Sequence, residues 1–328
     1  MIVDLPNTTA SKISKALVTI REEGGAVALG RVLTLVISTT LGQEEGAIEA
    51  ANDASREHPM RVIVISKSPA ADATTELRLD AQIRVGGDAG ASEVVLLKVH
   101  DAIGVDDEGL VMGLLLPDAP VVAWWPGIAP EKVSESTLGR IAQCRITDSA
   151  AQADPGAFLQ GISLNYAPGD VDFAWTRLTL WRAQLAAVLD QPPYEPIIGV
   201  QVHGSSESPS TLLLAAWLQL QLKVPVEYEL TLPDAAPIGI HGVTLMRRSG
   251  AIRLERPGLT IATLTQPNQP VHDISLPRRS LRDCLAEELR RLDPDDLFGE
   301  VVTIGLRQLG EPTIVRPSQE ADQKRDEQ

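Results

Sequence analysis

The sequence predicts an α/β fold made of two layered domains with mixed sheets, the second of which has a β-rich C-terminal part. Short β-branched runs alternate with helical patterns in the first half, as strand, helix, strand units do. Short paired strands prevail after residue 237. A chain of 328 residues is also long enough for two cores of ordinary size. We expect an N-terminal domain over 1–166, a linker over 167–170 within a C-terminal domain over 167–316, and a disordered tail over 317–328.

Elements of the first half follow from periodicity and from turn residues. Ile13, Leu17 and Ile20 share one helical face between a cap at Thr8 or Thr9 and an end at Gly24. Residues 77–85 alternate apolar and polar, which predicts a strand with one wet face, paired antiparallel with 93–99. The other expected strands are 32–38, 61–66, 121–125 and 145–147, and the other expected helices are 43–57, 106–116, 134–142 and 155–166.

The second half is organised around residues 197–222, which read as strand, turn and helix. The segment 211–222 is apolar on nearly every side, so we expect a helix covered on both sides inside a layered domain. Ser208 is its expected N-cap, and Pro209 suits the first helical position. The remaining expected elements are a helix over 175–189, a strand over 226–230, a hairpin of 239–247 with 251–255, a strand over 259–264 and a helix over 280–292.

Composition and charge limit the classes of partner and compartment. The net charge of −15 and the pI near 4.8 argue against nucleic acid and anionic membranes, because phosphate binding needs clustered Lys and Arg. The sequence begins without a secretory h-region, and no apolar run reaches the roughly 20 residues that a spanning helix needs. We therefore expect a cytoplasmic protein that neither binds nucleic acid nor enters a membrane.

Motifs for common cofactors and metals are absent from the sequence. It contains no GxxxxGK[ST], no GxGxxG after a strand, no GxSxG and no HExxH. The five histidines have no metal-site spacing, and Cys144 and Cys284 lie far apart without a CxxC motif. We expect no cofactor, no metal and no catalytic residue. Each cysteine is interpreted as a small apolar or inert residue, and a redox role for either is left open.

The loop after the strand at 197–202 is the first candidate site, formed by Gly204, Ser205, Ser206, Glu207 and Ser208. It lies where the carboxyl end of a strand meets a helix N-terminus, a place that attracts phosphate. Glu207 would repel a phosphate, however, and the loop has no Lys or Arg. A plain turn with a serine cap explains the same residues, and a serine activated by His203 is a further, weaker alternative.

Two aromatic and two basic residues are candidate contacts for a protein partner. Trp124 and Trp125 alternate across a predicted strand, so either both lie under helices or one is an exposed anchor, and burial rates favour the core. Arg78 and Arg84 lie on the polar face of the strand at 77–85, which is wet or meets a partner. These four residues are the predicted contact set.

The chain resembles the actinobacterial type of the glucose-6-phosphate dehydrogenase assembly protein family, OpcA. The likeness covers most of the chain, and it is the order and joint presence of its short segments that make it specific. The segments are Arg21-Glu22-Glu23-Gly24-Gly25, His58-Pro59-Met60-Arg61, Leu116-Pro117-Asp118-Ala119-Pro120, Trp124-Trp125-Pro126-Gly127, Asp148-Ser149 and Gly204-Ser205-Ser206-Glu207-Ser208-Pro209.

This resemblance implies a non-enzymatic cytoplasmic protein that binds glucose-6-phosphate dehydrogenase and favours its active oligomer, in the oxidative pentose phosphate pathway of carbohydrate metabolism. The hypothesis is an assembly factor or allosteric regulator acting through a protein–protein interaction. The alternative is an enzyme or sensor that binds a phosphorylated sugar or nucleotide at 204–210. A combination, in which a metabolite effector is sensed and reported to the dehydrogenase, stays open beside them.

Overall fold

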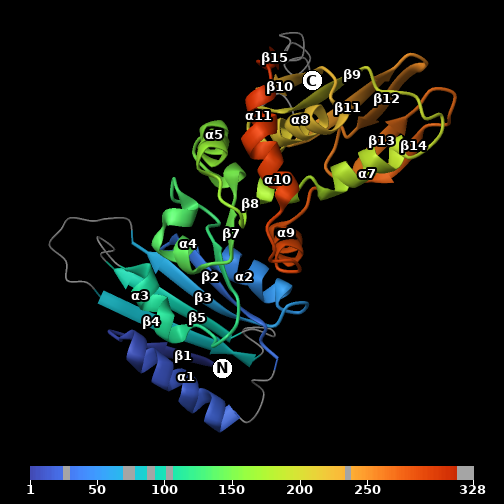
Figure 1. The fold of residues 1–328 in the computed structure, drawn as a ribbon. Coiled ribbons are helices and arrows are strands. Elements are labelled where there is room, and N and C mark those ends of the chain that lie inside the picture. The colour runs from blue at the N-terminus through green and yellow to red at the C-terminus, as the bar shows by residue number, and fades with distance from the viewer. Residues whose placement is uncertain (25–29, 69–77, 87–92, 101–105, 233–237, 316–328) are drawn as a thin grey trace, which may run out of the picture. The chain divides into compact units, whose positions relative to one another are not determined.

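The computed structural model describes residues 1–24, 30–68, 78–86, 93–100, 106–232 and 238–315. The chain divides into two compact units that alternate along the sequence. Unit 1 comprises Met1–Gln152, Ala167–Phe173 and Arg279–Asp295, and unit 2 comprises Ala153–Tyr166, Ala174–Arg278 and the residues from Asp296 on. Each unit has its own sheet and its own helices (Figure 1).

Unit 1 is built on an eight-stranded sheet of the described residues, in the order β1-β4-β5-β3-β2-β6-β7-β8. In this spatial order, all neighbouring strands from β5 through β3, β2, β6 and β7 to β8 are parallel. β4 pairs antiparallel with both β1 and β5. The chain runs outward from β2 through β3 to β5, then returns to the other side of β2 and runs through β6 and β7 to β8. The strands are β1 Ile2–Leu5, β2 Leu33–Thr40, β3 Met60–Lys67, β4 Arg78–Val85, β5 Glu93–His100, β6 Val121–Trp124, β7 Cys144–Thr147 and β8 Asp170–Asp172.

Helices cover both faces of this sheet, because its central strands are apolar on both sides. Leu35 and Ile37 of β2 enter one core cluster with α2 and α9, while Val36 enters the other with α1. Figure 1 shows α1 beside the edge formed by β1 and β4. The helices are α1 Ala10–Gly24, α2 Glu45–Ala54, α3 Asp107–Val111, α4 Thr137–Ile141 and α9 Leu281–Glu288, with short 3₁₀ turns at Met112–Leu114, Val133–Glu135 and Ser149–Ala151.

Unit 2 contains a seven-stranded mixed sheet of the described residues, in the order β14-β13-β12-β11-β9-β10-β15. β9 and β10 are parallel, as are β10 and β15, whereas β11 to β14 form an antiparallel meander. Its strands are β9 Gly199–Ser205, β10 Val226–Thr231, β11 Ile240–Arg247, β12 Gly250–Glu255, β13 Ile261–Thr265, β14 His272–Ser275 and β15 Thr313–Val315.

The core of unit 2 lies on one face of its sheet. Val200 and Val202 of β9 pack there with Leu213 and Leu214 of α8, while Gln201 and His203 point to the opposite, partly exposed face. Its helices are α5 Pro155–Asn165, α6 Phe173–Thr176 (whose first residue closes unit 1), α7 Thr179–Leu189, α8 Pro209–Leu222, α10 Asp296–Glu300, a π-helix at Val301–Gly305 and α11 Leu306–Gln308.

The predicted α/β class with two mixed sheets is confirmed, including the antiparallel pair of β4 with β5 and the meander after residue 237. The chain crosses between the two units more than once, whereas the sequence predicts a single boundary near 166. Residues 153–166 pack in unit 2, while 167–173 and 279–295 pack in unit 1. Asp170, expected in a linker, begins β8 because Arg145 Nε binds its Oδ1 at 2.5 Å and β8 pairs with β7. The expected tail over 317–328 lies outside the described residues.

Candidate functional site

Loop 204–208 connects β9 to α8 at a very close approach. A Cβ on Gly204 would lie 2.2 Å from Thr211 Oγ1 and 2.9 Å from the carbonyl oxygen of Gly239. Glycine is therefore required where the strand passes the first turn of the helix. Ser208 takes the N-cap position and Pro209 the first helical position, although the Ser208 side chain makes no cap hydrogen bond.

The backbone of this loop is already satisfied by the chain itself. Four of its N–H groups donate to internal acceptors, so they are not available to a phosphate. Glu207 is exposed and adds a negative charge at the helix N-terminus. The geometry therefore favours the alternative of a structural turn over a phosphate cradle. The four bonds run from Ser205 N to Gly239 O, from Ser206 N to Thr231 O, from Glu207 N to Ser205 Oγ and from Ser208 N to Ser205 O.

The contacts of His203 and Ser205 do not support a serine nucleophile in this loop. Its Nδ1 lies 3.0 Å from Glu229 Oε2 on the neighbouring strand β10. The Ser205 hydroxyl meanwhile accepts the N–H of Glu207 at 3.2 Å. A serine nucleophile needs a base within hydrogen-bond reach, and these contacts engage each group elsewhere.

Both tryptophans of the predicted contact set are buried within unit 1. Trp124 is fully buried and packs against Phe173 with ring centroids 5.5 Å apart. Trp125 is 4% exposed on the opposite side of β6, among the residues of the other core cluster. The alternative with both rings in the core is the one that the structure has, because helices cover both faces of the sheet.

Arg78 and Arg84 lie on the polar face of β4, as the alternation predicted. The Arg78 side chain is 57% exposed and pairs with Asp80, whose other partners are the N–H of Asn7 and His100. Arg84 is held firmly, since its two terminal nitrogens bind both oxygens of Glu45 at 2.7 and 3.0 Å. Hydrogen bonds from Arg84 lower the pKa of Glu45, and its partial burial opposes them by raising that pKa. Arg78 is thus the more accessible of the two cations.

A cleft of about 560 Å³ opens at the carboxyl ends of β2, β3 and β6 in unit 1. We call it the crossover cleft, because it lies between β2 and β6, where the chain reverses direction across the sheet. Trp125 and Leu138 contribute to its apolar wall. Its lining consists of Ser38, Thr39, Thr40, Lys67, Ser68, Asp107, Trp125, Ile128, Ala129, Pro130, Ser136, Thr137 and Leu138.

Sequence reasoning did not find the crossover cleft, although a signal for it exists. Polar residues follow the buried apolar runs directly, as Ser38-Thr39-Thr40 at the end of β2 and Ser66-Lys67-Ser68 at the end of β3. The carboxyl ends of parallel strands meet at one edge of a sheet, so such residues collect there. What the sequence could not supply is the strand order that brings β6 next to β2.

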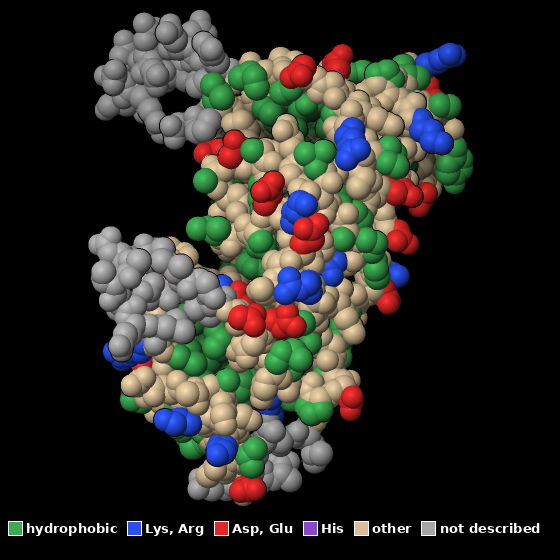
Figure 2. All heavy atoms as spheres, turned by 60° about the vertical axis from the view of Figure 1, so that its left-hand side comes forward, with side chains coloured by type: hydrophobic (Ala, Val, Ile, Leu, Met, Phe, Trp, Pro, Cys, Tyr) green, Lys and Arg blue, Asp and Glu red, His purple; other side chains and the backbone are tan. Residues whose placement is uncertain are grey.

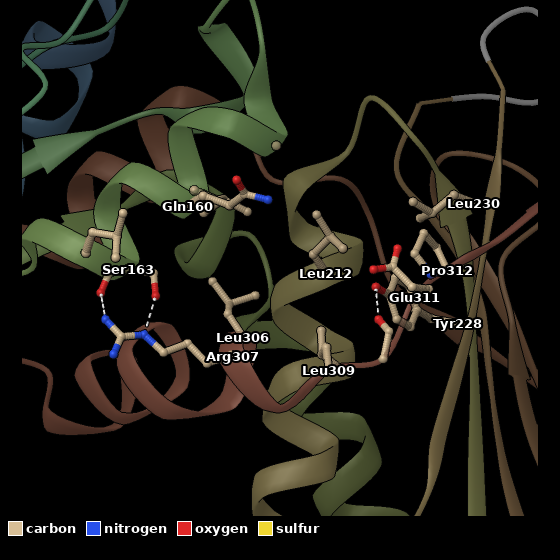
Figure 3. Close-up of a pocket in the computed structure, with 14 residues that line it drawn as sticks. Gln160, Ser163, Leu212, Tyr228, Leu230, Leu306, Arg307, Leu309, Glu311 and Pro312 are labelled. Carbon is tan, nitrogen blue, oxygen red and sulfur yellow. Dashed lines mark hydrogen bonds between the residues drawn. The ribbon is translucent and has the colours of Figure 1, made fainter.

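A second hollow, of about 610 Å³, lies in unit 2 and is lined mainly by leucines (Figure 3). Two of its polar side chains, Arg307 and Tyr228, are engaged internally. Arg307 donates to both the hydroxyl and the carbonyl oxygen of Ser163, and Tyr228 donates to the carbonyl oxygen of Gly310 at 2.7 Å. Burial and, after it, the charge of Glu311 raise the pKa of Tyr228.

The two cysteines are buried in the core cluster of unit 1 that contains α2 and α9. Burial raises the pKa of the Cys144 thiol to about 12, so this sulfur stays protonated at neutral pH. The thiolate is the reactive form of cysteine, and a buried thiol with a raised pKa is inert.

Within the described ranges, no group of three or more His, Cys, Asp or Glu side chains is placed to hold a metal ion. The described helices include none with the length and apolarity to cross a membrane. On the face seen in Figure 2, acidic and basic side chains are interspersed.

Two family models match the chain. Residues 51–163 match the model described as glucose-6-phosphate dehydrogenase subunit N-terminal domain, and residues 168–302 match the corresponding C-terminal domain. A comparison with curated proteins gave no significant match.

Similar solved structures include a 3-ketoreductase from Actinomadura kijaniata in complex with TDP-benzene and NADP, at 9% identity and a TM-score of 0.45, with 87% of this chain and 99% of that chain covered. Another is glucose-6-phosphate 1-dehydrogenase from Mycobacterium avium, at 10% identity and a TM-score of 0.41, with 88% of this chain and 95% of that chain covered.

Proposed function

Because the chain belongs to the OpcA family of glucose-6-phosphate dehydrogenase assembly subunits, we propose that it binds this dehydrogenase and favours its active oligomer without catalysing a reaction itself. The observation that carries the proposal is the pair of family matches, which together extend from residue 51 to residue 302 and so involve both compact units.

The proposed mechanism is a shift of population. A partner that binds the active oligomer more tightly than the inactive form raises the active fraction by that difference in binding free energy alone. Moving the dehydrogenase from 1:99 to 99:1 would need roughly a 10⁴-fold difference in affinity. No active-site residue of this chain is required, which agrees with the absence of common catalytic motifs from its sequence.

For the contact we propose the polar face of β4, with Arg78 at its exposed end. Arg78, Asp80 and Arg84 point from the same side of the strand, opposite to the apolar side packed in the core. Arginine is enriched at binding hot spots, and its planar guanidinium can grip a partner carboxylate with two hydrogen bonds. The partners act in the cytoplasm under this proposal, where the dehydrogenase supplies the oxidative pentose phosphate pathway.

Titration of the dehydrogenase with this chain tests the proposal. We expect dehydrogenase activity to rise to saturation with increasing chain, and no dehydrogenase activity from the chain alone. Arg78→Glu should shift the half-saturation point to at least tenfold higher concentration. Arg291→Glu is the matched control, because Arg291 is 78% exposed and pairs only loosely with Asp293 at 3.7 Å.

Two outcomes contradict parts of this proposal. If activity and the dehydrogenase's elution volume stay unchanged at micromolar chain, the assembly role is wrong. If Arg78→Glu and Arg291→Glu behave alike while the wild-type chain activates, the assembly role stands and the β4 face is not the contact.

A further inference from the structure

The crossover cleft has the position of a ligand site. In open α/β sheets, ligands bind outside the carboxyl ends of the strands at the point where the strand order reverses. In unit 1 this point lies between β2 and β6. The cleft is lined by Thr39 and Thr40, the last residues of β2, and by Ile128, which follows β6. Its volume of about 560 Å³ is within the usual range for small-molecule pockets.

The same region is unsuited to a pyrophosphate. In dinucleotide-binding folds the pyrophosphate lies on the N-terminus of the helix after the first strand, close to a glycine-rich turn. Here that helix is α2, and its first residues are Glu44, which is 5% exposed, and Glu45. Ser66 Oγ donates to Glu44 Oε2 at 3.3 Å, which holds this side chain at the start of the helix. A phosphate at the start of this helix would meet these carboxyl groups.

The charges inside the cleft balance each other. Lys67 and Asp107 are the charged residues of its described lining, and Lys67 Nζ lies 2.5 Å from Asp107 Oδ2. The Asp107 side chain is 9% exposed, and its other oxygen, Oδ1, is buried without a hydrogen-bond partner among the described residues. A buried acceptor without a donor is unfavourable, so a ligand hydroxyl that reaches this carboxylate from the cleft and donates to it would be favoured.

Hydroxyls and an apolar wall complete the lining. Ser38, Thr39, Thr40 and Thr137 each offer a group that can donate and accept. Trp125, Ile128, Ala129, Pro130 and Leu138 line the cleft with apolar surface. Hydroxyls, one carboxylate acceptor and an apolar wall suit a ring that has hydroxyls on its rim and an apolar face.

We propose that the crossover cleft binds a neutral polyhydroxylated ring, either a free hexose or the ribose of a nucleoside. One ligand hydroxyl donates to Asp107, an adjacent one accepts from Lys67, and Thr39 and Thr137 bind the remaining hydroxyls. This inference does not rest on the proposed function, since it concerns the chain alone.

Isothermal titration of the full chain tests the inference with four probes, D-glucose, adenosine, glucose 6-phosphate and NADP⁺. We expect at least one neutral probe to bind, and its phosphorylated counterpart to bind at least tenfold more weakly at the same ionic strength. The two neutral probes distinguish a hexose from a nucleoside. Absence of heat and of a melting shift with both neutral probes at 20 mM would overturn the inference, as would tighter binding of the phosphorylated probes.

Variants then locate the binding. Asp107→Asn should weaken the neutral probe at least tenfold, and the milder Thr39→Val should weaken it at least threefold. Thr19→Val is the matched control, because Thr19 is exposed on α1, away from the cleft lining, and donates only to the carbonyl of Lys15. If circular dichroism shows that Asp107→Asn does not fold, the affinity of the Thr39→Val variant decides whether the cleft is the binding site. Unchanged affinity in the folded cleft variants would place the ligand elsewhere and refute the site. Dehydrogenase activation is measured separately, so the failure of either proposal leaves the other intact.

Discussion

At the scale of single residues, Gly204 fixes how closely the central helix of unit 2 approaches its sheet. The atoms that a side chain would meet are the side chain of Thr211, which is fully buried, and the backbone carbonyl of Gly239. Neither can move without shifting β9 against α8. The glycine in this loop is thus explained by packing, with no ligand needed.

Gly204→Ala should therefore destabilise unit 2 by about 1–3 kcal/mol, the usual cost of forcing an extra methyl group into a filled core. Gly161→Ala in α5 of the same unit is the control, since nothing outside its own helix lies within 4 Å of the added carbon. That change should be neutral or stabilising by about 0.5–1 kcal/mol, because alanine favours helix. Urea unfolding measures both, and equal free energies of unfolding for the two variants would contradict the packing account.

Cysteine burial leads to a second prediction at this scale. Both thiols should fail to react with DTNB at pH 8 in the folded chain and react once urea unfolds it, because each is buried. Since the folded pKa of Cys144 is raised, the folded state holds this proton longer than the unfolded state does. Its contribution to stability is complete below the ordinary thiol pKa near 8.5 and is lost as pH rises towards about 12. Rapid labelling of folded chain would reopen a redox role.

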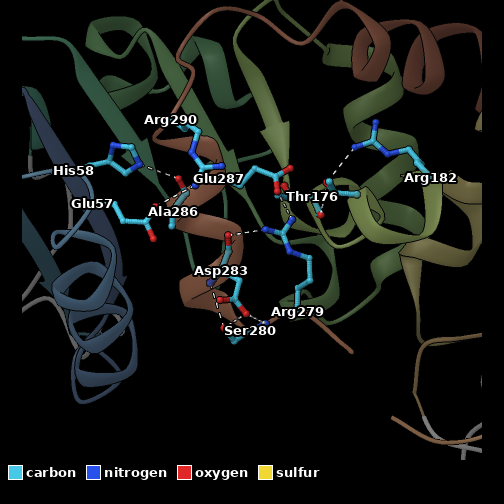
Figure 4. A network of polar contacts seen from close by, with 11 residues as sticks. Glu57, His58, Thr176, Arg182, Arg279, Ser280, Asp283, Ala286, Glu287 and Arg290 are labelled. Atoms are coloured by element: carbon cyan, nitrogen blue, oxygen red, sulfur yellow. Dashed lines mark hydrogen bonds and ion pairs between the residues drawn. The ribbon is translucent and has the colours of Figure 1, made fainter. Parts of the chain in front are cut away.

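At the scale of elements, α9 shows where sequence reasoning succeeds and where it ends. Its stripe of leucines predicts a helix over 280–292, and the structure has one over Leu281–Glu288. Its destination was not predictable, because a stripe of leucines specifies burial but not the partner. In the structure α9 packs against α2 of unit 1, where His58 Nε2 lies 3.1 Å from the carbonyl of Ala286 and Arg290 pairs with Glu57 (Figure 4).

Three short strands that the sequence did not predict were missed for the same physical reason. β8, β14 and β15 have only three or four residues each, too few for a periodicity to show. They form because a neighbouring strand offers hydrogen bonds, as β7 does for β8. Long runs such as β2 and β3 carry their own signal, since parallel strands covered on both faces are continuously apolar.

The cap of α9 provides a prediction at the element scale. Ser280 Oγ accepts from Asp283 N while Asp283 accepts from the Ser280 N–H and hydroxyl, which is a capping box. Ser280→Ala should cost about 1 kcal/mol in urea unfolding at pH 7. The control is Ser11→Ala on the exposed face of α1, which should change the free energy of unfolding by less than about 0.5 kcal/mol.

Acid should erase this difference. The hydrogen bond from Ser280 is the main cause that lowers the pKa of Asp283, against the opposing effect of its partial burial. A lowered folded pKa stabilises above the ordinary Asp value near 3.9, and the benefit is lost as pH falls through the lowered value. The gap between wild type and Ser280→Ala should therefore shrink below about pH 4. A gap that is constant with pH would show that the carboxylate does not contribute.

At the scale of the whole molecule, the chain combines a doubly covered sheet with a sheet covered on one face. The sequence predicts both mixed sheets, whereas the interleaving of 153–173 and 279–295 depends on contacts between residues far apart in the chain. Of the predicted site residues, the tryptophans proved to be core, and Arg78 retains the exposure that a contact needs. The crossover cleft needed the strand order and could come only from the structure.

The central claim is that this chain shifts glucose-6-phosphate dehydrogenase towards its active oligomer. The most direct measurement is the mass distribution of the dehydrogenase by mass photometry, diluted through the concentration at which its oligomer dissociates, with and without a saturating amount of this chain. The account predicts that the chain joins the complex, lowers the dissociation midpoint at least tenfold in concentration and raises activity in parallel. An unchanged midpoint with no added mass would contradict it.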